Sequence, residues 1–111
     1  MKQNFTPALD NLHDCTLLRL DIIFEHREIE ILVEEEVDGN RKSIRFKGVS
    51  EISLGELISF SEFELIEVNS VNVTKQEHGF NVEFVFLLGI SRPSWSVSFD
   101  FGELEYTIIP S

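Results

Sequence analysis

Cysteine, basic residues and long apolar runs are all scarce in this 111-residue sequence. Its single cysteine, Cys15, cannot form an internal disulfide, and no apolar run precedes Pro7, so we expect a cytoplasmic location. The longest nearly uninterrupted apolar stretch, residues 84–88, is far shorter than the roughly 20 residues of a membrane-spanning helix. Only 9 Lys and Arg accompany 20 Asp and Glu, and a formal net charge of −11 argues against binding nucleic acid. We therefore expect neither a membrane nor a nucleic-acid partner.

The sequence indicates one globular domain, residues 1–111, because 42% of its residues are hydrophobic and no linker or repeat interrupts it. A chain of this length can bury roughly two thirds of its unfolded surface, so its core requires no metal or disulfide. The excess of acidic residues favours basic partners, or none.

Apolar residues alternate with polar ones along seven segments, and this period of two is typical of β-strands. The segments are residues 18–24, 28–33, 44–54, 65–74, 80–88, 95–101 and 104–108. Turns are predicted at His26-Arg27, at Asp38-Gly39-Asn40 and at His78-Gly79.

The alternation changes phase at Gly48 and again near Asn69-Ser70, and a bulge at each place would explain the change. Residues 55–63 fit one or two helical turns as well as an irregular apolar loop. Short strands, bulges and a strongly aromatic inner face predict an all-β antiparallel meander of about seven strands. Its curved sheet would form either a sandwich or a partly open barrel, with edge strands through which two copies could pair.

Three reactive side chains adjoin at His13, Asp14 and Cys15, directly before the first predicted strand. A nucleophile and its base must converge in space, which adjacent positions at a strand entrance seldom allow. We therefore interpret Asp14 as a turn residue, Cys15 as a core residue, and His13 as a hydrogen-bonding residue whose loss would cost about 1 to 2 kcal/mol if that bond is buried.

Other patterns point to no cofactor or metal. The histidines stand in separate turns without zinc-ligand spacing, and the acids around residue 36 lack the alternating ligand positions of a calcium loop. The acids are a solvated hairpin tip or a patch that faces a cationic partner. The Phe-rich interior is either a packed core or, in a small barrel, a ligand cavity.

A resemblance extends over residues 12–109. The entry Leu12-His13-Asp14-Cys15 and the later strand Arg45-Phe46-Lys47-Gly48-Val49 resemble small bacterial β proteins grouped with the Imm50-like predicted immunity proteins of polymorphic toxin systems. The resemblance implies a cytoplasmic β protein that binds and blocks a toxin domain, with no catalytic residue carried over. Cys15 departs from the commoner Ser or Ala of that pattern, and the loop of residues 89–95 is extended.

We therefore expect a non-catalytic binding module, an immunity protein for a basic toxin domain, rather than an enzyme. The alternative is a small-barrel carrier of an apolar molecule, which would require a pocket of about 300 Å³ or more. Candidate protein-binding residues lie in two places, the acidic hairpin tip and the extended loop before the strand at 95. They are Glu34, Glu35, Glu36 and Asp38, and Ile90, Arg92 and Trp95.

Overall fold

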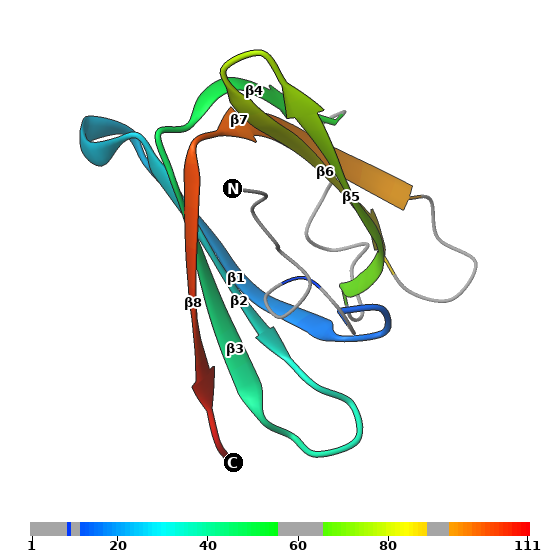
Figure 1. Ribbon diagram of the computed structural model, residues 1–111. Helices are drawn as coiled ribbons and strands as arrows, with labels where there is room; N and C mark the ends of the chain where they lie inside the picture. Colours follow the sequence, from blue (N-terminus) through cyan, green and yellow to red (C-terminus); the bar gives the residue numbers. More distant parts are fainter. Residues whose placement is uncertain (1–8, 10–11, 56–65, 89–93) are drawn as a thin grey trace.

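The computed structural model describes residues 9, 12–55, 66–88 and 94–111, and its strands form one antiparallel sheet (Figure 1). The strands are β1 (Thr16–Ile23), β2 (Glu28–Glu34), β3 (Arg41–Lys47), β4 (Ser50–Leu54), β5 (Glu67–Gln76), β6 (Gly79–Leu87), β7 (Ser94–Phe101) and β8 (Glu103–Ile109). The sheet order is β4-β7-β6-β5-β1-β2-β3-β8, so β4 and β8 are its edges and no barrel closes. The prediction of an all-β antiparallel fold with a curved sheet is confirmed.

The sheet has two halves, β8-β3-β2-β1 and β5-β6-β7-β4, which curve towards each other (Figure 1). The two halves meet at a short seam in which Thr16 of β1 pairs with Glu67 of β5. Backbone hydrogen bonds extend this seam, because the Asp14 N–H donates to the Val68 carbonyl and the Val68 N–H donates to the Cys15 carbonyl, both at 2.9 Å. The turn that contains Asp14 therefore extends the hydrogen bonding between β1 and β5.

The core lies between the facing halves and consists of the apolar residues that alternate along each strand. Phe46 of β3 is fully buried and lies edge-on to Phe99 and Phe101 of β7, with ring centroids 4.9 and 5.0 Å apart. The alternation predicted for the second, fifth and sixth segments is confirmed by burial of the same residues. These are Ile29, Ile31 and Val33, then Val82, Phe84, Phe86 and Leu88, then Val97, Phe99 and Phe101.

The first strand differs from its prediction. The register of β1 against β2 shifts between Leu17 and Arg19, so that Leu18 is a bulge residue and lies exposed. Phe24, predicted on the inner face, is 80% exposed in the short 3-10 helix η1 (Phe24–His26). This helix also widens the predicted two-residue turn, which ends at Arg27 with a positive φ of 54°.

Gly48 is a corner between two strands and not a bulge within one, so the third predicted segment divides into β3 and β4. Gly48 has a φ of 67°, and a Cβ there would lie 3.5 Å from the backbone N of Gly102, which starts the return from β7 to β8. At Gly48 the chain passes from β3 in one half of the sheet to β4 in the other half, and at Gly102 it returns from β7 to β8. Among the described residues the sheet therefore has eight strands, and it is not a simple meander because β8 pairs with β3 and β4 with β7.

The other predicted irregularities agree with the structure. The register of β5 against β6 shifts between Val68 and Ser70, which confirms the bulge near Asn69. Gly39 and Gly79 have positive φ angles of 68° and 106° in the predicted turns. The open choice between helical turns and loop concerned residues 55–63, of which 56–63 lie outside the described residues.

Candidate protein-binding site

The acidic loop, residues 34–38, runs from the end of β2 into the turn to β3. The Glu35 N–H donates to the Asn40 carbonyl at 2.8 Å, and the Gly39 N–H donates to the Glu35 carbonyl at 3.1 Å. The side-chain oxygen Oδ1 of Asn40 accepts a hydrogen bond from the Ser111 N–H, which ties the loop to the C-terminal residue. The loop thus has a fixed backbone before any partner arrives.

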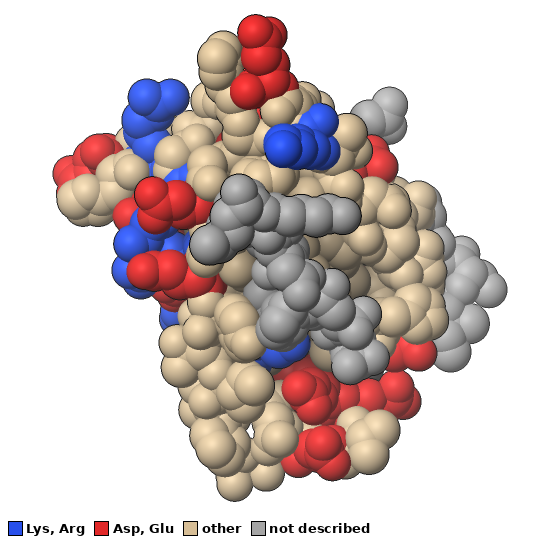
Figure 2. Space-filling view, in the orientation of Figure 1, with Lys and Arg blue, Asp and Glu red and all other residues tan. Residues whose placement is uncertain are grey.

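The four acidic residues predicted here have different surroundings. Glu34 lies opposite Arg41, and its Oε2 accepts a hydrogen bond from the Arg41 Nε at 3.3 Å. Glu35 is partly buried, whereas Glu36 and Asp38 are exposed, and in the described part of the chain neither forms an ion pair. Figure 2 shows carboxylates gathered at the end of the molecule where this loop lies. Glu36 and Asp38 are therefore the acids most available to a partner.

Sequence reasoning missed Val37, which stands between them and is 92% exposed. An exposed apolar side chain costs solvation free energy that contact with a partner can recover. The signal was present in the sequence, as the one apolar residue in a run of acids, but exposure follows from the turn geometry.

The surroundings of Cys15 do not fit a nucleophile. Burial raises the pKa of the Cys15 thiol, and the nearby carboxylate of Glu35 raises it further, while Lys42 acts in the opposite direction. The thiol is 3% exposed and belongs to the core, whereas His13 lies in solvent with its Nδ1 3.1 Å from Oδ2 of Asp14. Cys15 is the predicted core residue. The His13 side chain is exposed, so the condition of a buried hydrogen bond, on which the loss of about 1 to 2 kcal/mol depended, is not met.

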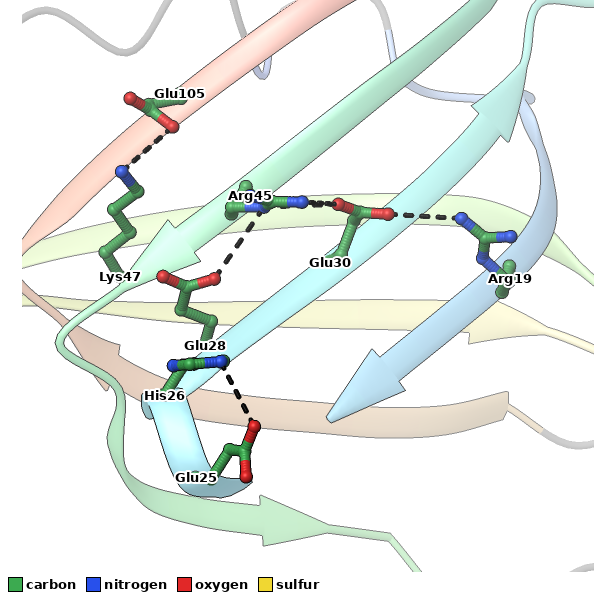
Figure 3. Close-up of polar contacts among 8 residues, drawn as sticks. All are labelled: Arg19, Glu25, His26, Glu28, Glu30, Arg45, Lys47 and Glu105. Carbon is green, nitrogen blue, oxygen red and sulfur yellow. Dashed lines mark hydrogen bonds and ion pairs between the residues drawn. The ribbon is translucent and has the colours of Figure 1, made fainter. Parts of the chain in front are cut away.

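The outer face of β1, β2, β3 and β8 carries a network of ion pairs, drawn in Figure 3. Glu30 is at its centre, accepting hydrogen bonds from Arg45 Nη2 at 2.6 Å and from Arg19 Nη2 at 3.1 Å. At the end of the same face Lys47 Nζ lies 3.1 Å from Glu105 Oε1. The hydrogen bond from Arg45 lowers the pKa of Glu30, and the same bond raises the pKa of Arg45. This network fixes cations to the sheet and leaves them little freedom to bind a ligand.

The residues predicted in the extended loop are placed differently. Ile90 and Arg92 lie outside the described residues. Trp95 lies in β7, partly buried, with its ring 5.8 Å from that of Phe86. A Cβ on Gly55 would come within 2.7 Å of the Trp95 ring, so the backbone of residue 55 packs directly on the indole. Trp95 therefore contributes to packing, and the structure does not bring it together with the acidic loop.

A groove of about 270 Å³ lies between the β1–β2 connection and the start of β4. Its lining includes Ile22, Phe24, Val49 and Ile52, and the exposed Phe24 leaves it open to solvent. A carrier site encloses most of its ligand, whereas this groove is open to solvent. Among the described residues, the buried Phe rings lie in the core between the facing halves.

Comparison of the sequence with protein-family models and with curated proteins gives no match. Within residues 9, 12–55, 66–88 and 94–111, no three His, Cys, Asp or Glu side chains gather as metal ligands. In the same ranges no helix is long and apolar enough to cross a bilayer.

Proposed function

We propose that this protein is a non-catalytic, cytoplasmic binding module that neutralises a bacterial toxin domain, and that the acidic loop contacts a basic surface of that domain. The observation that carries the proposal is the tip of the loop, where Val37 is almost fully exposed between the carboxylates of Glu36 and Asp38. An apolar side chain flanked by acids can bury apolar area in a partner while its neighbours meet Lys or Arg.

Two further properties support this function. The backbone hydrogen bonds of the loop reduce the ordering that binding would require, which favours affinity. The net charge of −11 attracts a basic partner over distances longer than a contact, so that association is faster at low salt. The resemblance to Imm50-like immunity proteins is consistent with a toxin as that partner.

The test begins with the reading frames beside this gene: any toxin-like domain encoded there is co-expressed with the intact chain and, separately, immobilised for association kinetics. Wild-type chain should protect growth, and its association rate should fall as salt rises. The double variant E36K/D38K should associate about tenfold more slowly at low salt, with the fold unchanged by circular dichroism.

A matched control makes the same change in charge elsewhere. Glu25 and Glu77 are highly exposed in other turns, so E25K/E77K alters net charge equally without altering the loop. If both double variants slow association to the same extent, the loop is not the contact. If wild-type chain neither protects growth nor binds, the immunity function itself is wrong.

A further inference from the structure

The two edges of the sheet differ in how they are protected from pairing with another chain. The β4 edge is short, and its register against β7 shifts between Ser50 and Ser53, with Glu51 at a φ of 51°. Bulges of this kind twist an edge away from a straight partner strand. In contrast, the seven residues of β8 pair with β3 without a register shift, and the described residues place no strand on its outer side.

The β8 edge also exposes apolar side chains. Tyr106, Ile108 and Ile109 are 40%, 52% and 44% exposed. Tyr106 and Ile108 lie opposite Ile44 and Lys42 of β3, whose side chains are buried, so both point towards the inner face. A straight edge strand with exposed apolar residues is a template for pairing with a further strand.

We propose that two copies of this chain pair through β8, antiparallel, around a two-fold axis at Tyr106. Tyr106 is the middle residue of β8, so this register is the one in which all seven residues are paired. The opposed residues across the axis would be Tyr106 with its own copy, Leu104 with Ile108, Glu105 with Thr107, and Glu103 with Ile109. The two eight-stranded sheets would become continuous.

The chemistry of these pairs supports this register over its neighbours. Leu104, Tyr106 and Ile108 form an apolar row along one face, and each Glu faces an uncharged residue. A two-fold axis at Glu105 would instead oppose Glu105 to itself, and like charges in direct opposition are unfavourable. An axis at Thr107 would oppose Leu104 to Pro110, which lacks an N–H for the ladder. A register shifted by one residue would place inner-face side chains of one copy opposite outer-face side chains of the other.

The experiment is sedimentation velocity of the isolated chain over a range of concentrations, which does not depend on the proposed toxin. Wild-type chain should form a dimer. T107E places a second carboxylate opposite Glu105 of the other copy, twice per dimer, and should weaken dimerisation about tenfold. T107K, at the same position, should strengthen it. E105Q/T107E removes one carboxylate from each opposed pair without adding a cation beside Lys47, and it should recover the dimer.

Disulfide trapping tests the register separately. Y106C places the new thiol opposite its own copy, and mild oxidation should link two chains; T107C faces Glu105 and should link far fewer. Cys15 is buried, so wild-type chain should stay unlinked. A wild-type chain that is monomeric at every concentration would overturn the proposal. So would a dimer that responds equally to T107E and T107K, since it would use another surface.

Discussion

Replacing Phe46 with Ala tests whether the two halves of the sheet are held together by aromatic packing. Phe46 is the residue of β3 whose ring meets the opposite half, edge-on to Phe84, Phe99 and Phe101 at centroid distances of 6.0, 4.9 and 5.0 Å. Its side chain is fully buried, so truncation leaves a cavity that the surrounding rings can fill only in part.

The expected loss is about 4 kcal/mol, within the range of roughly 3–5 kcal/mol for buried Phe to Ala changes. Single domains are stable by only about 5–15 kcal/mol, so F46A should remain marginally folded at best. F46L keeps most of the volume but loses the edge-on contacts, and it should cost about 1 to 2 kcal/mol.

Urea denaturation, followed by the fluorescence of Trp95, measures both losses, because the protein has one tryptophan and that residue packs on Phe86. The control is F24A, which truncates an exposed Phe and should change stability by less than about 0.5 kcal/mol. The reasoning is refuted if F46A costs under about 1.5 kcal/mol, or if F24A costs as much as F46A.

Two groups should show pH-linked effects. Arg45 lowers the pKa of Glu30, so the ionised Glu30 contributes its full stabilisation of the folded state at neutral pH. This contribution is lost as the pH falls from about 4.3, the ordinary carboxyl pKa, through the lower pKa of the folded state. The urea midpoint of wild-type chain should therefore fall at acidic pH, and E30Q should reduce this fall. An unchanged fall in E30Q would contradict the reasoning. The pKa of Cys15 is raised by burial, so stability should decline above about pH 8.5 as the unfolded thiol ionises first, and C15A should remove that decline. A disulfide reagent should label Cys15 far faster in denaturing urea than in buffer; equal rates would mean that the thiol is accessible.

Alternation predicted the inner faces of β2, β6 and β7 because burial on one face of a strand leaves a period of two in the sequence. The bulge near Asn69 was predictable for the same reason, since the phase of the apolar residues changes within one strand. The phase of β1 was not, because Leu18 is as apolar as its neighbours and only the register against β2 identifies it as the bulge residue. Alternation assigns faces, but cross-strand register decides which residue is left unpaired.

The strand order depended on contacts that are remote in sequence. Gly48 could be recognised as an irregularity, but its role as a corner depends on the close approach of Gly102. Pairing of β3 with β8 joins segments about sixty residues apart, and no local propensity specifies it.

The candidate site was found only in part for a similar reason. The acids of the loop were evident, but their pairing was not, because Glu34 meets Arg41 only in the observed hairpin register.

The distribution of cations explains why acidic surface remains at the loop. Arg19, Arg45 and Lys47 are held by carboxylates on the outer face of one half, and Arg41 is held by Glu34 at the base of the loop. Each of these pairs cancels charge locally, whereas Glu36 and Asp38 at the loop tip form no ion pair with a described residue. At the loop tip the two exposed carboxylates of Glu36 and Asp38 are separated by an apolar side chain and lie on a backbone that is already ordered. A surface retained for solubility alone needs only the charge, whereas a surface that contacts a partner gains from the exposed Val37 as well. V37D would keep the loop acidic and soluble while removing that apolar contact, so it separates these two roles.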